Sequence, residues 1–231
     1  MAASRHDRPS AAIRRRDIEY CVDQGLAYDV GMLARDAQLV AVDFESTGSV
    51  AGYRDEPWQV ACVPIRGGCV QVEEGLELFL RVAADRPFNP CAPGSWRERR
   101  EQLAHAPTLD EALPLLRGHV LHVPLVAHHA ATEKKFFRHA WPLHRPGPWI
   151  DTLKLARRAY PALPGHELDA VIAALGLSDQ VQRLAPGRAA HDAFYDAAAC
   201  AVLLCHLLSQ PGGETITVDE LVRASGSALK Y

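Results

Sequence analysis

Two acidic side chains stand at the end of an apolar run in LVAVDFESTG, residues 39–48. Alternation along a strand sends Asp43 and Glu45 to the same side. Two carboxylates that lie close together repel one another, and one of them takes up a proton unless a cation intervenes. Mg²⁺ and Mn²⁺ prefer hard oxygen ligands of this kind. The pattern favours a divalent metal site here, although Asp-x-Glu also occurs in surface ion pairs.

A histidine and an aspartate five residues apart, His191 and Asp196, form a second candidate pair. Five helical steps place side chains roughly 140° apart. The two therefore converge only if His191 sits at the entrance of a helix and Asp196 in its first turns, and Gly187 favours an entrance there. A histidine with a reference pKa of ~6.5 suits proton abstraction near neutral pH. Asp192 is a competing partner for this histidine.

A third candidate lies in VAHHAATEKKF, where a strand ending in His128 and His129 leads into a helix that carries Glu133. Histidines at strand ends are more often structural hydrogen-bonding residues than ligands. The segment alone leaves both interpretations open.

Taken in order, these segments resemble the motifs of the DEDDh branch of the 3′-to-5′ exonucleases, the DnaQ-like family of the bacterial proofreading subunit and ribonuclease T. DFESTG resembles the first motif, VAHHAATEKKF the second and HDAFYDAAACAVLL the third. IDTLKLARR and HELDAVIAALGL resemble the connecting helices, so the resemblance covers about residues 39–208. Glu133 stands where the family has Asp, and His129 where it has Asn. A sub-branch with His-His-Ala-x-x-Glu shares this pattern.

The resemblance implies an α/β fold of the ribonuclease H-like type, a five-stranded mixed sheet flanked by helices on both faces. It implies hydrolysis of the terminal phosphodiester at 3′ ends of single-stranded DNA or RNA, with two Mg²⁺ or Mn²⁺ ions and release of nucleoside monophosphates. His191 would be the general base. The implied metal ligands, which are also catalytic, are Asp43, Glu45, Glu133 and Asp196. The implied substrate-binding residues are Thr47, Gly48, His128 and His129.

The elements that must position these residues follow an α/β pattern. WQVACVPIRGGCVQVEE predicts two strands that turn at Gly67–Gly68. APTLDEALPLLRGH predicts a helix capped by Thr108, VLHVPLVAHH a strand, and HDAFYDAAACAVLLCHLL a long buried helix. Residues 87–100 predict a loop, in which Trp96 is either a base-stacking residue or a loop anchor. A meander followed by alternating helices and strands indicates a mixed sheet.

The chain has 231 residues and 48% hydrophobic content, which suits one globular domain with small appendages. We expect a helical extension over residues 1–38, including a helix from Ile13 to about Asp36. The exonuclease domain then spans residues 39–210, and a turn with a short helix spans 211–231. The net charge of −3 gives no global sign of nucleic-acid binding. A local basic rim suffices, and the candidates, which also suit solvated faces, are Lys134, Lys135, Arg138 and Arg188.

The six cysteines include no CxxC pair, so we expect reduced, mostly buried thiols. The N-terminus lacks the apolar stretch of a signal peptide, and no apolar run reaches ~18 residues. These features predict a cytoplasmic protein without a membrane contact, and they identify no protein partner.

Two other functions fit parts of the sequence. The first is a catalytically weakened nucleic-acid-binding or protein-interaction module on the same fold, suggested by Glu133 and by the unusual stretch SWRERREQLAH. The second is a zinc protein built on the histidines of HVLHVPLVAHH. Residues of one strand cannot easily surround an ion, which disfavours the zinc protein.

Overall fold

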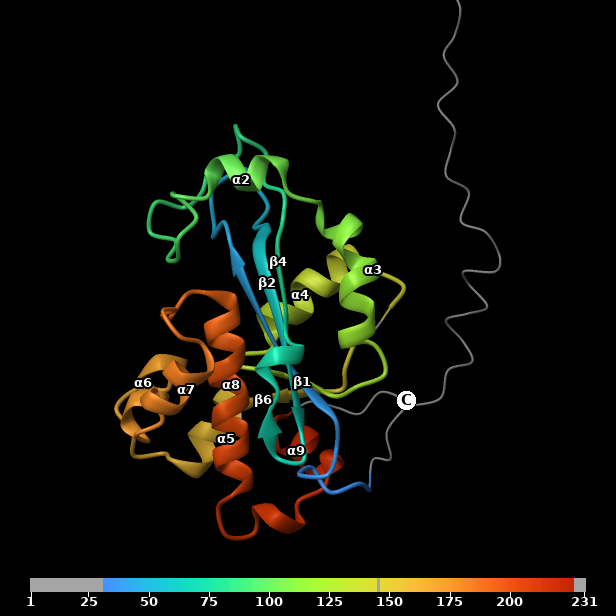
Figure 1. Cartoon of the computed structure of the whole chain (residues 1–231), viewed down its shortest axis with the longest axis vertical. Coiled ribbons are helices and arrows are strands. Elements are labelled where there is room, and N and C mark those ends of the chain that lie inside the picture. Colours follow the sequence, from blue (N-terminus) through green and yellow to red (C-terminus); the bar gives the residue numbers. More distant parts are fainter. Residues whose placement is uncertain (1–30, 145, 227–231) are drawn as a thin grey trace, which may run out of the picture.

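A computed structural model describes residues 31–144 and 146–226 and shows a mixed sheet between two helical layers (Figure 1). The central strand is β1 (Leu39–Ser46). It pairs antiparallel with β2 (Pro57–Arg66) and parallel with β5 (Leu125–Ala127). Strand β6 (Trp149–Asp151) continues the sheet parallel to β5. The antiparallel and parallel pairings together make the mixed sheet that was predicted.

The outer edge of β2 is shared by two short strands, β3 (Cys69–Val70) and β4 (Leu76–Phe79). The sheet therefore has six strands, in the order β3-β2-β1-β5-β6 with β4 also on β2. Five of these strands fall on predicted strands, whereas β4 was not predicted and lies beyond the segment WQVACVPIRGGCVQVEE. The predicted second strand of the hairpin is interrupted by the 3-10 helix η1 (Val72–Glu74), because an edge strand has a single partner and leaves its pairing easily.

Helices cover both faces of the sheet. The long helix α8 (Ala193–Leu208) lies on one face, and α3 (Leu109–Val120) and α4 (Ala131–Ala140) lie on the other (Figure 1). The remaining helical segments are α2 (Arg100–His105), α5 (Thr152–Ala159), α6 (Leu168–Ala174), α7 (Ser178–Leu184), η2 (Gly213–Thr215) and α9 (Val218–Ala224). None of the helices in the described residues is long and apolar enough to cross a bilayer.

The core forms on both faces because side chains alternate along β1. Leu39 and Ala41 pack in the cluster that contains the alanines of α8, whereas Val42 and Phe44 pack with the aromatic residues of α4. Small alanine side chains allow α8 to lie close to the sheet. The residue after Val42 therefore faces α8, and this places the first acid of the motif opposite the helix that carries the third motif.

Side-chain caps fix the first residue of the helices α3, α5, α8 and α9. Thr108 caps α3 through a capping box with Glu111, as predicted. The strand predicted over residues 120–129 is wrong at its start, because α3 extends to Val120 and β5 begins only at Leu125.

The predicted N-terminal helix falls mostly on residues 13–30, outside the described part of the chain. Residues 31–38 form turns instead of helix, since Leu33 forms a bridge with Thr217 and the Ala34 N–H donates to the Ile216 carbonyl at 2.9 Å. This stretch packs against the C-terminal segment.

The described cysteines are free thiols. Cys62 and Cys200 are buried, as expected of core residues, and Cys205 is partly buried. Cys69 and Cys91 are exposed, so the expectation of mostly buried thiols is wrong for these two.

Candidate active site

The two acids of β1 lie at the carboxyl end of the central strand, on the face covered by α8. Asp43 pairs with Ala61 and Glu45 with Gln59 across the β1–β2 ladder, and the register shifts just beyond, between Glu45 and Ser46. Glu45 is buried and Asp43 is partly buried. Charged groups are rarely buried without a partner, so the acids at this end of the sheet either hold protons or are balanced by a positive charge.

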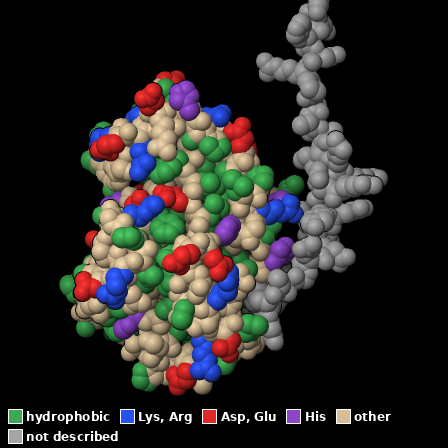
Figure 2. All heavy atoms as spheres, viewed as in Figure 1, with side chains coloured by type: hydrophobic (Ala, Val, Ile, Leu, Met, Phe, Trp, Pro, Cys, Tyr) green, Lys and Arg blue, Asp and Glu red, His purple; other side chains and the backbone are tan. Residues whose placement is uncertain are grey.

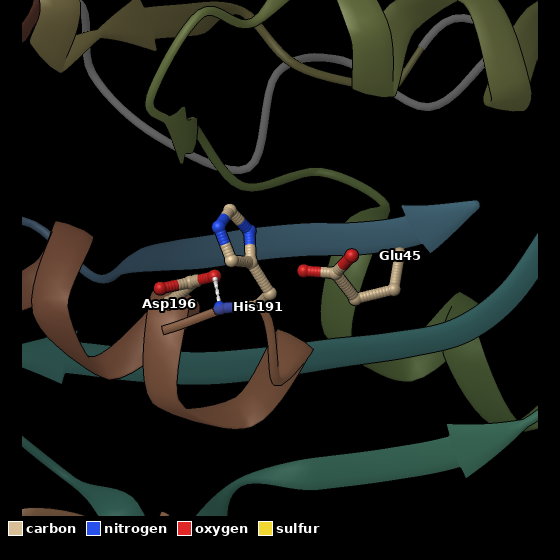
Figure 3. Close-up of side chains that lie close together, drawn as sticks. All are labelled: Glu45, His191 and Asp196. Atoms are coloured by element: carbon tan, nitrogen blue, oxygen red, sulfur yellow. Dashed lines mark hydrogen bonds between the residues drawn. The ribbon is translucent and has the colours of Figure 1, made fainter. Parts of the chain in front are cut away.

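The loop before α8 brings the histidine to these acids. His191 adopts a left-handed backbone with φ 67°, and its backbone N–H donates to Asp196 Oδ2 at 2.8 Å. One ligand atom each of Glu45, His191 and Asp196 lies within 4.8 Å of the others (Figure 3). The helix begins at Ala193, so His191 sits at its entrance and Asp196 in its first turn. This is the arrangement that the sequence required for convergence.

Asp192 is not the partner of the histidine. It caps α8 by accepting the backbone N–H groups of Phe194 and Tyr195, and it forms an ion pair with Arg188 at 2.8 Å. Its role is to fix the start of the helix.

Glu133 reaches the same site from α4. Its side chain is 3% exposed, and Oε2 is buried without a hydrogen-bond partner in the described residues. Burial is the main cause of the raised pKa of Asp43 and of Glu45, and the negative charge of Glu133 adds to it, so Glu133 lies within electrostatic reach of both acids. A glutamate therefore stands near the site at the position where the family has aspartate.

The carboxylates of Asp43, Glu45, Glu133 and Asp196 repel one another when all four are ionised. Burial, and then the charge of Asp196, raise the pKa of Asp43 well above its usual range. Burial raises the pKa of Glu45 and of Glu133 to about 8 each, and that of Asp196 to about 7. Neighbouring acids, including Asp196 and Asp192 at Glu45, add to this effect.

A divalent cation fits this arrangement. Its charge would offset the repulsion among the acids, and the unpartnered Oε2 of Glu133 supplies a free oxygen donor. Oxygen-rich donor sets suit Mg²⁺ or Mn²⁺ rather than softer metals.

The predicted substrate-binding residues of the first motif are held rigidly. Thr47 is fully buried, and its Oγ1 accepts hydrogen bonds from the Glu56 N–H at 3.0 Å and Arg86 Nη2 at 3.0 Å. Gly48 has φ 72°, and a Cβ there would lie 2.9 Å from Asn89 Cβ. The positive φ and the close approach of residue 89 both require glycine at this position.

The two histidines of the second motif serve different contacts. Both ring nitrogens of His128 are engaged within the protein, with Thr152 Oγ1 at 3.0 Å and the His166 carbonyl at 2.8 Å. His129 has φ 70°, and its backbone N–H donates to Asp151 Oδ1 at 3.2 Å. In this structure His128 is a hydrogen-bonding residue within the protein, which is one of the two roles that the sequence left open for it.

A polar network behind His191 is the main feature that the sequence analysis missed. Gln59 is 1% exposed and accepts the Ala193 N–H at 3.2 Å, while its amide donates to Glu77 at 2.7 Å. Arg188 pairs with Glu77 at 2.7 Å and with Asp192. The network anchors the start of α8 to the sheet. Its one sequence signal is a glutamine inside the apolar strand WQVACV.

The predicted basic rim is partly neutralised within the protein. Arg188 belongs to the network just described, and Lys135 pairs with Asp55 at 3.5 Å. On the face drawn in Figure 2, Lys and Arg side chains alternate with Asp and Glu, without a single basic patch.

The loop of residues 87–99 links the first and third motifs. The Asn89 N–H donates to the Thr47 carbonyl at 2.8 Å. At the other end, a Cβ on Gly94 would lie only 2.8 Å from the His191 carbonyl oxygen, so the loop touches the histidine segment. Trp96 stacks on Phe88 at 4.3 Å between ring centroids and therefore anchors the loop. A groove of about 650 Å³ runs between this loop and residues 187–192, beside His191.

The exonuclease family model RNase_T matches residues 40–204. Exodeoxyribonuclease 10 of Escherichia coli K12 is 32% identical over 131 residues, which cover 57% of this chain and 54% of that protein. The PolC-type DNA polymerase III of Bacillus subtilis is 27% identical over 219 residues, 91% of this chain and 14% of the polymerase. The chain thus spans about half the length of the first relative and a small part of the second.

Solved nuclease structures share the fold. The nuclease domain of 3′hExo, a DEDDh family member bound to rAMP, has a TM-score of 0.58 at 17% identity. The alignment covers 80% of this chain and 97% of the 3′hExo chain. Escherichia coli Exonuclease I in complex with a dT13 oligonucleotide has a TM-score of 0.58 at 16% identity, and the alignment covers 76% of this chain and 42% of the Exonuclease I chain. The predicted ribonuclease H-like fold is confirmed.

Proposed function

The chain belongs to the RNase_T exonuclease family, and from this premise we propose that it removes nucleoside monophosphates from the 3′ end of single-stranded DNA or RNA. The observation that carries the proposal is the convergence of Glu45, His191 and Asp196 within 4.8 Å at the end of β1. Two separate motifs, the first and the third, supply these groups. A purely structural role gives no reason for four buried or partly buried carboxyl groups without a cation.

Asp43, Glu45, Glu133 and Asp196 would hold two divalent ions, Mg²⁺ or Mn²⁺. When bound, such a pair of ions supplies charge for both the attacking and the leaving oxygen of a phosphodiester. The acids are held by rigid elements, two on β1, one on α4 and one on α8, which keeps their positions fixed during the reaction.

His191 would take a proton from the attacking water. Its segment is exposed, while its backbone is tied to Asp196 by the 2.8 Å hydrogen bond. The ring therefore keeps access to solvent and substrate in a defined position at the edge of the acidic site. Histidine is the side chain that most often acts as a general base.

The reach of Glu133 supports catalysis over the alternative of a weakened binding module. A side chain that had lost its role would have no reason to keep Oε2 buried and without a hydrogen-bond partner, since burying such a polar atom costs free energy.

The test is degradation of 5′-labelled single-stranded DNA and RNA in Mg²⁺, Mn²⁺ or EDTA. We expect a metal-dependent ladder that shortens from the 3′ end, and loss of the ladder in His191→Ala. His122→Ala is the matched control, because His122 has a similar left-handed backbone with φ 64° but lies at the other end of the sheet, before β5. Intact label with wild-type protein in every lane would refute the proposal.

A further inference from the structure

A hollow of about 290 Å³ lies beside the candidate active site, between the loop from β1 to β2 and helix α4. Its wall includes Arg54 from the loop and Lys135 and His139 from the helix. Lys135 is two residues from Glu133, and the loop starts at Thr47, whose hydroxyl is 3.3 Å from Asp55 Oδ1. Both walls of the hollow therefore continue directly from the residues of the site.

The charges in the hollow leave one guanidinium available. Asp55 is paired with Lys135 at 3.5 Å, and Glu56 with Arg86 at 3.6 Å. Arg54 has no carboxylate partner among the described residues and contacts the ring of His139, with Nη1 2.8 Å from Nδ1. A guanidinium presents a planar set of donors that matches a phosphate. An anion entering the hollow would meet donors from Arg54 without displacing an existing ion pair.

The residue that precedes Arg54 in the chain, Tyr53, carries an exposed aromatic ring. Tyr53 is 52% exposed, and the guanidinium of Arg86 lies 4.8 Å from its ring centroid. Arg86 is 5% exposed and donates a hydrogen bond to Thr47 Oγ1. The guanidinium that supports the Tyr53 ring is therefore fixed to the first motif. Proteins hold single strands by base stacking on exposed rings together with backbone charge, and the consecutive residues Tyr53 and Arg54 offer one group of each kind.

We propose that Arg54 and Tyr53 form a subsite for the nucleic-acid strand upstream of the bond that is cut. Arg54 binds a backbone phosphodiester in the hollow, and Tyr53 stacks on a neighbouring base. The subsite rests on the proposed function, since it assumes that a single strand enters the active site. It reads no sequence, because a phosphate and the face of a base are common to all nucleotides.

Binding of a fluorescent single-stranded oligonucleotide, measured by anisotropy in Mg²⁺ at several KCl concentrations, tests the subsite. Every protein carries Asp43→Asn so that the strand is not cut. We expect Arg54→Ala to weaken binding about ten-fold, as for the loss of a charged hydrogen bond. The slope of log affinity against log salt should fall by about one. Arg54→Lys should keep that slope, since it retains the charge.

Arg66→Ala is the matched control, because Arg66 is an exposed arginine at the opposite end of β2 and pairs with Glu74. Equal affinities of the Arg54→Ala and Arg66→Ala proteins overturn the subsite, and so does an absence of binding by the parent protein. In the same assay, Tyr53→Ala should weaken binding and Tyr53→Phe should not, because stacking uses the ring face. The proposed function is judged separately, from strand degradation by the wild-type protein.

Discussion

Substitution of Gly94 by alanine should impair His191 without touching any charged group of the site. A Cβ at Gly94 would lie 2.8 Å from the His191 carbonyl oxygen and 3.0 Å from Trp58 Cζ2. Both distances are shorter than the ~3.5 Å of a favourable contact. Trp58 is fully buried and stacks on Phe79, whereas His191 is exposed. The histidine segment is therefore the side that moves.

Two costs add at Gly94. Its φ of 86° is left-handed, which costs alanine about 1–2 kcal/mol. Overpacking against Trp58 and His191 adds about 1–3 kcal/mol. The expected loss of unfolding free energy is thus about 2–5 kcal/mol. Displacement of His191 by a fraction of an ångström should lower kcat by up to about a hundred-fold.

Gly52→Ala is the matched control for the backbone cost. Gly52 has a similar φ of 79°, but a Cβ there would meet nothing within 4 Å. Urea unfolding and kcat on a labelled oligonucleotide are measured for both variants. We expect Gly52→Ala to lose about 1–2 kcal/mol with kcat unchanged. Similar values for the two variants, in stability and in kcat, would refute the idea that residue 94 positions the histidine.

Three further predictions concern the acids and their support. Asp43→Asn should abolish cleavage while the protein stays folded, as seen by circular dichroism; retained cleavage would contradict the site assignment. Without metal, Glu45 and Glu133 in the folded state keep their protons up to pH about 8, and Asp196 keeps its proton up to pH about 7. In the unfolded chain the same groups lose their protons near pH 4. The stability of the folded state should therefore fall as pH rises from 5 to 8 in EDTA, and Mg²⁺ should reduce this fall; equal urea midpoints at both pH values would exclude the raised pKa values. Arg188→Met should lower the free energy of unfolding by only about 1 kcal/mol, because the two ion pairs of Arg188 are partly exposed. The substitution should also lower kcat, because it loosens the start of α8. An unchanged kcat would show that this network does not contribute to catalysis.

The sequence by itself determined the order of the motifs, most of the elements and the family. The caps at Thr108 and the turn at Gly67–Gly68 depend on contacts within a few residues, so local patterns predicted them. The match over residues 40–204 confirms the family resemblance. The requirement that His191 precede the helix of Asp196 also followed from helical geometry alone, and the structure has this arrangement.

Tertiary structure decided everything that depends on residues far apart in the chain. The split of the outer strand, the shortened β5 and the contact of Leu33 with the C-terminal segment follow from edge pairing and packing, which no local pattern encodes. The same holds for the use of Arg188 in a network and for the loop that joins Thr47 to His191. The residue types show which side chains are able to do chemistry. Only the packing of distant segments decides which of these side chains are buried together in a low-dielectric environment, and this burial determines whether their acidic groups are charged.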